Sequence, residues 1–517
     1  MKISKITSYL IPLLYWAIIM LLISTLDRGC ESNDQKFNEI IDLIENSYVD
    51  TVNSNALFEV TINDMLHKLD PHSHYIPARA VKSMNEMTQG RFGGIGISFF
   101  LLRDTVCVIS VIPGSPAMRN DLKAGDKIVS VNNKKFERNI TSEKVMSLLK
   151  GIEGTEVSLT LIRENEKIKK RLKRGSIPVE SVVAAYMITN KVGYIKINQF
   201  TVSTSLEFSL LASKLKQQGL KKLILDLRDN GGGVLTGATD IADLFLSAGR
   251  PIVETRGENS PLQTYYASEN SPLIDIDLVL LINLETASAS EILAGAIQDN
   301  DRGLIIGRRS FGKGLVQEDK QLNDGSNLRL TIARYYTPTG RCIQKPYSGD
   351  FDSYNQDVIN RYENGEMYLI DSSQFIDSLK FITPKGRVVY GGGGIMPDIF
   401  VPYESSGLSS FYSELRSLNA FRTFAFDYVK DKRNKWLSPK RFNEEFKVTS
   451  SLLNTFLNFS ESNYKLETQR KEFQVSRNLI AQRMKAEIAN QIWGEHGFYQ
   501  VINTENADIK EALKAFN

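Results

Sequence analysis

Two stretches near the middle of the chain change from an apolar run to a helical spacing of apolar residues. The runs at residues 222–227 and 278–284 have the length and composition of buried strands. Helical spacing follows each of them, at residues 235–247 and again up to residue 299. Small residues join each run to its helix. These two strand–turn–helix units predict a layered α/β fold whose chemistry lies at strand ends.

The flanking parts of the chain have different patterns. Residues 33–88 show apolar positions at helical intervals, and the pattern becomes helical again beyond about residue 408. Between residues 90 and 174, short apolar runs alternate with turn residues, and a single short helix is expected at 143–149. The segment 345–380 is less regular and has the character of an insertion. The chain is therefore expected to be a multidomain α+β protein.

The amino terminus has the pattern of a membrane anchor. Lys2 and Lys5 precede an apolar stretch at residues 6–26, and about 20 such residues can span a bilayer. The lysines place the amino terminus on the inside. A cleaved signal peptide is the alternative, but small residues are missing before Asp27. We therefore expect an uncleaved anchor at residues 1–27.

Length and composition exclude several classes. A chain of 517 residues is too long for one core, and a net charge of +3 gives no case for nucleic-acid binding. The cysteines Cys30, Cys107 and Cys342 are odd in number and far apart, which favours neither a disulfide framework nor a metal site. His72 and His74 follow an aspartate, but no further cluster completes a metal site, so a turn is the simpler interpretation. We expect no metal and no cofactor.

The second strand–turn–helix unit presents serines at the start of a helix. Its turn contains Ser288 and Ser290, with only small residues around them. Free backbone N–H groups and the helix dipole favour a developing negative charge at such a position. Simple helix capping is the alternative, because serine is also a common N-cap.

A lysine downstream is a candidate for the base that a serine nucleophile would need. Lys313 lies between two glycines and precedes a hairpin turn signal at residues 321–326. If this segment is extended, Lys313 and Gln317 fall on one strand face. The chain has no histidine between residues 180 and 400, so a lysine made neutral by burial is the economical base.

Taken together, the sequence around Ser288 and the segment 311–317 resemble the carboxy-terminal processing (tail-specific) serine peptidases. The resemblance implies Ser288 as nucleophile, Lys313 as general base and Gln317 as the residue that orients the lysine. Lys313 lies 25 positions after Ser288, an interval that suits the family and selects Ser288 over Ser290. The resemblance also covers residues 46–50, 69–73 and 383–399.

In that family, backbone N–H groups form the oxyanion hole. Carried over, the donors are Gly232, with Gly231 or Gly233 as alternatives, and Ala289. A phosphate-binding loop is the competing interpretation of the glycines, but no Gly-Lys-Ser/Thr follows them. One departure from the family is the pair Glu285-Thr286, where glycine and serine are frequent.

Residues 90–174 resemble a PDZ domain. The loop formed by Gly94, Ile95, Gly96 and Ile97 would hold the terminal carboxylate of a peptide through backbone N–H groups. The peptide would pair with the adjacent strand edge. The Gly94–Ile97 loop lacks the third glycine and the following helix of a dinucleotide site.

These expectations combine into one domain order and one function. The order is an anchor (1–27), a helical amino-terminal region (33–88), a PDZ domain (90–174), a crotonase-like layered peptidase core (180–402) and a helical carboxy-terminal region (408–517). The function is a membrane-anchored serine endopeptidase that recognises the carboxy-terminal tails of proteins through its PDZ domain. Its catalytic part is expected outside the cytoplasm, in the periplasm of a two-membrane cell.

Two other functions compete with this one. A hydratase-like enzyme could use glycine-turn oxyanion holes with carboxylates as acid and base, and a tethered PDZ scaffold could have lost activity. The helices after residue 408 fit either a domain of this chain or an interface for a second copy or an adaptor.

Overall fold

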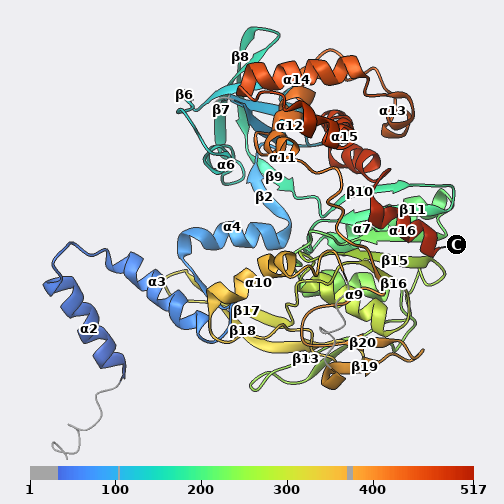
Figure 1. Cartoon of the computed structure of the whole chain (residues 1–517). Helices are drawn as coiled ribbons and strands as arrows, with labels where there is room; N and C mark the ends of the chain where they lie inside the picture. The colour runs from blue at the N-terminus through green and yellow to red at the C-terminus, as the bar shows by residue number, and fades with distance from the viewer. Residues whose placement is uncertain (1–32, 103–104, 370–376, 517) are drawn as a thin grey trace, which may run out of the picture.

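The computed structural model describes residues 33–102, 105–369 and 377–516. Two lobes make up the body, and helices α2 (Asn33–Ser47) and α3 (Ser54–His67) form an arm beside it (Figure 1). The predicted anchor at 1–27 and Cys30 lie outside the described residues. Within the described ranges, no helix is both long and apolar enough to cross a membrane.

The lower lobe in Figure 1 contains the predicted α/β core. Its main sheet has six strands in the order β10-β11-β12-β15-β16-β21, and all neighbours except β10 and β11 are parallel. The strands are β10 (Val182–Met187), β11 (Val192–Ile197), β12 (Lys222–Asp226), β15 (Asp277–Ile282), β16 (Leu304–Gly307) and β21 (Ile399–Phe400). Because parallel strands end at the same edge, the loops at 227–234, 283–288 and 308–314 meet there.

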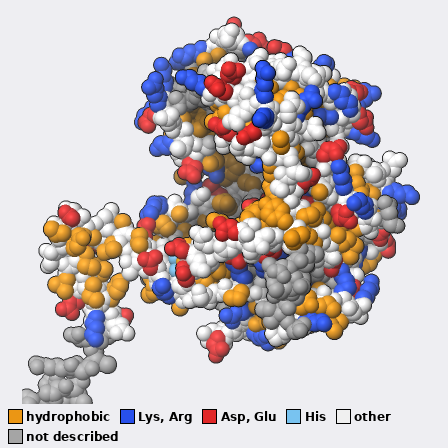
Figure 2. Space-filling view, in the orientation of Figure 1, with side chains coloured by type: hydrophobic (Ala, Val, Ile, Leu, Met, Phe, Trp, Pro, Cys, Tyr) orange, Lys and Arg blue, Asp and Glu red, His pale blue; other side chains and the backbone are white. Residues whose placement is uncertain are grey.

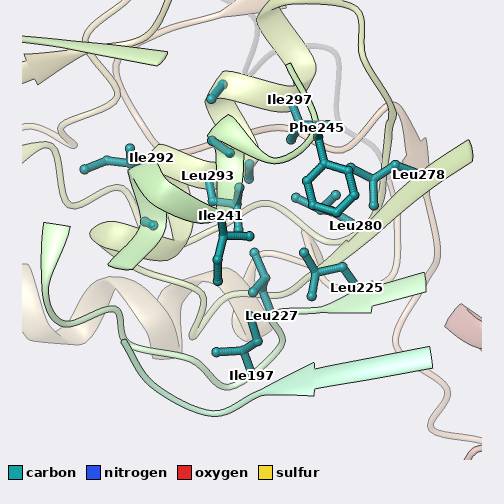
Figure 3. Close-up of a cluster of buried hydrophobic side chains, with 14 of the residues drawn as sticks. Ile197, Leu225, Leu227, Ile241, Phe245, Leu278, Leu280, Ile292, Leu293 and Ile297 are labelled. Atoms are coloured by element: carbon teal, nitrogen blue, oxygen red, sulfur yellow. The ribbon is translucent and has the colours of Figure 1, made fainter. Parts of the chain in front are cut away.

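Helices cover both faces of this sheet. On one face lie α7 (Thr204–Gln217), α8 (Leu235–Asp243) and α9 (Ala289–Asp299), which contribute to a continuous apolar core (Figure 3). Phe245, Leu280 and Leu293 lie within this core. The opposite face packs against α16 (Ala507–Ala515), the last helix of the chain. The strands carry apolar residues on both faces, as expected for a parallel sheet covered on both sides.

A second sheet flanks the core and carries the predicted hairpin. Strands β17 (Leu315–Gln321) and β18 (Asn327–Tyr336) are antiparallel, and their turn lies where the sequence indicated it. The sheet order is β1-β18-β13-β14, with β13 (Pro251–Arg256) and β14 (Gln263–Tyr266). Strand β1 (His74–Ile76) comes from the region predicted to be helical, so that prediction is incomplete. The amino-terminal region thus contributes a strand to the peptidase core.

The upper lobe in Figure 1 contains the β-rich domain. Its sheet has the order β3-β4-β5-β7-β8, with β6 beside β5, and α6 (Ser142–Leu149) packs on it. The strands are β3 (Ile97–Leu102), β4 (Thr105–Val111), β5 (Lys127–Val131), β6 (Lys134–Lys135), β7 (Glu156–Arg163) and β8 (Glu166–Lys173). A two-stranded pair, β2 (Arg91–Gly94) and β9 (Gly175–Pro178), links it to the lower lobe. Strand β8 is not evident from the sequence because five of its eight residues are lysine or arginine.

The helical carboxy-terminal region shares the upper lobe with the β-rich domain. It comprises α11 (Ser410–Ser417), α12 (Ala420–Tyr428), α13 (Pro439–Glu445), α14 (Ser450–Tyr464) and α15 (Arg470–Ile502), which form their own apolar core. Phe426 of α12 contacts Phe100 of β3 with ring centroids 5.2 Å apart. The supposed irregular segment 345–380 contains α10 (Phe351–Glu363), so the expectation of irregular structure is wrong there.

Candidate active site

Ser288 occupies a sharp turn between β15 and α9. It is the N-cap of α9 and has a φ of 56°, an unusual value for a residue with a side chain. Its backbone N–H donates to Glu291 Oε2 at 2.8 Å. The turn places Ser288 in the wall of a cleft, at the positive end of the helix dipole.

Ser290, the alternative serine, is committed to the protein interior. It is fully buried, and its Oγ donates to the carbonyl of Asn230 at 2.9 Å. The side chain therefore ties the serine turn to the glycine loop and does not line the cleft.

Lys313 lies in the same cleft as Ser288. Its Nζ donates to Gln317 Oε1 at 2.9 Å. Burial lowers the pKa of Lys313 to about 8, and the nearby Arg329 charge acts in the same direction. A large fraction of this amine is therefore neutral at mildly alkaline pH.

The strand expected to carry both Lys313 and Gln317 begins only at Leu315. Lys313 belongs to the irregular loop before it, and a register shift separates Val316 from Gln317. The prediction of a shared strand face is therefore wrong, although the two side chains do meet.

Gln317 is itself held by the amino-terminal region. Its Nε2 donates to the carbonyl of His72 at 2.6 Å. The turn that presents this carbonyl is closed by Asp70, which accepts from the backbone N–H groups of His72 and Ser73 at 2.8 and 2.9 Å. The sequence indicates a turn here, and the contact of this turn with the site is not evident from the residue pattern.

The ring of His72 is not suited to acid–base catalysis in this arrangement. Its Nε2 lies 3.1 Å from the Tyr354 hydroxyl. Burial lowers the pKa of His72 to about 3, and the positive charge of Lys313 adds to that effect. The ring is therefore uncharged at neutral pH.

Among the residues described by the structure, no group of three or more metal-binding side chains is present.

Glu291 connects the serine turn with the lysine loop, and the sequence analysis did not single it out. Its carboxylate accepts from the Ser288 N–H and, across the site, from the N–H groups of Gly312 and Lys313 at 2.7 and 2.9 Å. The Ser310 hydroxyl donates to it at 2.6 Å. Burial raises the pKa of Glu291 to about 7, while these hydrogen bonds act in the opposite direction. A glutamate three residues after an N-cap serine is typical of a capping box, and this spacing is the sequence signal that points to Glu291.

The glycine loop at 227–234 packs directly against the serine turn. A Cβ on Gly232 would lie 2.8 Å from Ser288 Cβ and 2.9 Å from the Ala289 nitrogen, so only glycine fits this approach. The Gly232 N–H donates to Asn230 Oδ1 at 2.9 Å. A substrate carbonyl would have to share or replace that contact, and the assignment of oxyanion donors to Gly232 and Ala289 stays a prediction.

The cleft has a volume of about 730 Å³. Gly231, Gly232 and Gly233 line it together with Ser288 and Ala289, and Lys313 and Gln317 line it as well. Met84 and Met87 of α4 (Ala78–Gln89) contribute an apolar wall. Figure 2 shows the molecule hollowed between the two lobes. The structure therefore brings every predicted catalytic residue of the core to one cleft.

The predicted carboxylate-binding loop lies apart, in the β-rich domain. Gly94 ends β2 and Ile97 begins β3, an edge strand of its sheet. Ile95 is only 2% exposed and packs in the domain core, so its side chain cannot meet a peptide. The position of β3 at the edge of its sheet agrees with strand addition.

The fold and site define a class of protein: a PDZ-containing hydrolase with a serine at a helix N-terminus. Residues 191–351 match the sequence profile of peptidase family S41, and residues 93–173 match that of the PDZ domain. Residues 24–80 match the CtpB amino-terminal domain, and residues 411–494 match DUF8443, a family of unknown function. The chain belongs to peptidase family S41 and is a carboxy-terminal processing protease.

Proteins that are similar to this chain are described as proteases. A carboxy-terminal-processing protease of Bartonella bacilliformis is 35% identical over 353 residues, which are 66% of this chain and 80% of that protein. A probable CtpA-like serine protease of Staphylococcus aureus is 35% identical over 62% of this chain and 64% of its own length. The solved photosystem II D1 C-terminal processing protease is 28% identical, with 60% of this chain and 91% of that chain covered at a TM-score of 0.35.

Proposed function

We propose that the protein is a membrane-anchored endopeptidase that binds the carboxy-terminal tails of protein substrates and cleaves them with a Ser288–Lys313 dyad. The observation that carries the catalytic part is the half-buried Lys313 amine, which is held by Gln317 in the cleft that Ser288 lines. A lysine in this environment releases its proton far more readily than one in water.

In the proposed reaction, neutral Lys313 removes the proton from Ser288 Oγ as that oxygen attacks the scissile carbonyl. The tetrahedral oxyanion accepts hydrogen bonds from Ala289 and the glycine loop, and each such donor contributes about 3 to 4 kcal/mol to transition-state stabilisation. Collapse breaks the C–N bond, and the Lys313 ammonium donates its proton to the leaving amine. Water then hydrolyses the acyl-enzyme with Lys313 as base again.

Gln317 supports this role by orienting the lysine. Its carbonyl oxygen accepts from Lys313 Nζ, while its amide group is fixed by the His72 carbonyl. An amide oxygen can orient the amine although it carries no negative charge. A carboxylate in the same place would raise the pKa of Lys313. This arrangement suits a base that must lose its proton near neutral pH.

The membrane part of the proposal rests on the sequence alone. Lys2, Lys5 and the apolar stretch at 6–26 support a single anchor with the amino terminus inside. The catalytic part would then face the periplasm or the exterior.

A fluorophosphonate probe, which modifies activated serines, tests the catalytic proposal on the membrane-bound full-length chain. We expect stoichiometric labelling at Ser288, together with cleavage of an unfolded protein substrate near its carboxyl end. Ser288→Ala should abolish both. Labelling at another serine, with full activity in Ser288→Ala, would exclude the proposed nucleophile.

A further inference from the structure

The last helix of the chain reaches the catalytic loops through a buried carboxylate. Asp508 is the second residue of α16 and is only 3% exposed. The side chain of Asn506, just before the helix, caps it by accepting from the Ile509 N–H at 3.2 Å. A carboxylate in the first turn of a helix is also favoured by the helix dipole. The first turn of α16, which carries Asp508, is therefore held by its own cap.

One partner of Asp508 begins the glycine loop. Arg228 Nη1 donates to Asp508 Oδ2 at 2.6 Å and to Asn506 Oδ1 at 3.0 Å. The same guanidinium donates from Nε and Nη2 to the two oxygens of Asp226, at 3.0 and 2.6 Å. Asp226 ends β12, and Gly232 follows Arg228 by four positions. Arg228 therefore connects α16 with the base of the predicted oxyanion loop.

The other partner begins the lysine loop. Arg308 follows β16 directly, and Lys313 lies five positions further on. Its guanidinium makes a bidentate contact with Asp508, at 3.0 Å to Oδ1 and 2.8 Å to Oδ2. Arg308 Nη1 also donates to the carbonyl of Val401 at 2.9 Å. Such bidentate pairs fix direction as well as distance.

We infer that Asp508 is a positioning residue for peptide hydrolysis, because it fixes the loops 227–234 and 308–314 relative to each other. The inference rests on the proposed dyad, since these loops carry the predicted oxyanion donor Gly232 and the predicted base Lys313. Asp508 does not touch the reacting atoms. It acts on them through Arg228 and Arg308.

Charge and burial explain why loss of this carboxylate should move one loop more than the other. Arg228 keeps Asp226 as an ionic partner, whereas Asp508 is the carboxylate paired with Arg308 in the described parts of the chain. Arg308 is only 8% exposed, and an unpaired buried guanidinium is costly. Its loop therefore has to shift until the charge reaches water. That shift would displace Lys313 from Ser288.

The test compares Asp508→Asn with a matched variant in the full-length protein. Glu487→Gln removes another buried carboxylate, which lies 2.7 Å from Arg483 and 3.9 Å from Arg422 within the helical region. The measurements are kcat and KM for a peptide substrate, the rate of fluorophosphonate labelling and the melting temperature. All rates are taken well below both melting temperatures.

For Asp508→Asn we expect kcat and the labelling rate to fall about 10- to 100-fold while KM changes by less than about threefold. Glu487→Gln should lower the melting temperature to a similar degree and keep kcat within about twofold of the wild type. A wild-type kcat in Asp508→Asn, or an equal loss in both variants, overturns the inference.

Two further variants keep the outcome interpretable. If Asp508→Asn does not fold, Arg308→Lys replaces it, since a lysine keeps the charge but loses the bidentate contact. A wild-type kcat in that variant overturns the positioning role. Ser288→Ala is measured in parallel: turnover in that variant refutes the proposed nucleophile, whereas an inactive Ser288→Ala beside a fully active Asp508→Asn refutes the positioning role alone.

Discussion

At the scale of single residues, the site is organised by hydrogen bonds between three short loops. Glu291 joins the serine turn to the lysine loop, and Asn230 joins the serine turn to the glycine loop. The Tyr335 hydroxyl lies 2.7 Å from the carbonyl of Lys313 and 3.2 Å from that of Ser288. Preorganisation of this kind fixes the reacting groups before substrate arrives.

The two serines of the turn should respond differently to the same substitution. Ser288→Ala should lower kcat by at least about 10³-fold, because the nucleophile is lost. Ser290→Ala should keep most of the activity and lose about 1 kcal/mol of stability, because a hydrogen bond to Asn230 is lost. Peptide cleavage and thermal unfolding measure the two effects. A fully active Ser288→Ala would contradict the assignment.

The pH dependence should report the lysine. Because Lys313 acts only when neutral and its pKa is about 8, kcat should rise about tenfold per pH unit below that value and level off above it. The direction follows from burial, which favours the uncharged amine. The measurement is kcat between pH 5.5 and 9.5, with the melting temperature followed over the same range as a control for unfolding. If kcat reached its plateau below pH 7, Lys313 with a pKa of about 8 could not be the general base.

At the scale of elements, the edge strand β3 and the loop before it form the expected peptide-binding position. The carbonyl oxygens of Ile95 and Gly96 accept from Ala117 and Ile112 at 2.8 and 3.0 Å. Gly96 has a φ of 82°, and a Cβ there would lie 2.2 Å from Ser115 Cβ. The loop is therefore rigid and closely packed.

Peptide binding can be tested with two matched glycines. Gly96→Ala should reduce binding of an apolar peptide with a free carboxylate by about tenfold or more, since the loop must move to avoid Ser115. Gly154 has the same φ of 82° with open space around it, so Gly154→Ala carries the backbone strain without the clash. Calorimetry measures both affinities. Equal affinities in the two variants would remove the loop from the binding site.

The same peptide distinguishes two roles of the PDZ domain. In gating, the domain covers the cleft until a peptide tail binds to it. In tethering, it only raises the local concentration of substrate. A tail peptide too short to be cleaved is added with an unrelated unfolded substrate. Gating predicts stimulation at low peptide concentration that is lost on amidation of the carboxylate, because the free tail shifts the population of open molecules. Inhibition at every concentration would exclude gating and leave the protease assignment intact.

At the scale of the whole molecule, the helices after residue 408 pack against other domains of the same chain. They pack against the β-rich domain at Phe100 and Phe426, while α16 covers the peptidase sheet. A second copy or an adaptor is not needed to explain these buried faces. In contrast to these buried faces, the arm has exposed apolar side chains, among them Phe37, Ile40 and Leu43.

The proposed topology is a property of the entire chain and can be tested in a two-membrane bacterial host. Alkaline phosphatase, which is active only outside the cytoplasm, is fused after residue 40. We expect an active fusion, because Lys2 and Lys5 retain the amino terminus inside. The control replaces the apolar stretch at 6–26 with a polar linker and should be inactive. A membrane-bound but inactive fusion would reverse the orientation.

The sequence by itself determined the local part of this protein. Continuous apolar runs located β12 and β15, because burial on both faces of a parallel sheet leaves such runs, and helical spacing located α8 and α9. The sequence also singled out Ser288, Lys313 and Gln317, since their residue types and spacing carry the resemblance to the family. Strand β8 escaped notice because its charged side chains hide the strand pattern.

The tertiary structure decided which distant residues serve these local features. The His72 carbonyl reaches Gln317 across 245 positions, and Asp508 reaches Arg308 across 200. Neither contact leaves a trace in periodicity, because each is made by polar atoms of single residues, whereas periodicity reflects the packing of apolar side chains. Only the folded chain shows that β1 and α16, from opposite ends of the described residues, complete the peptidase core.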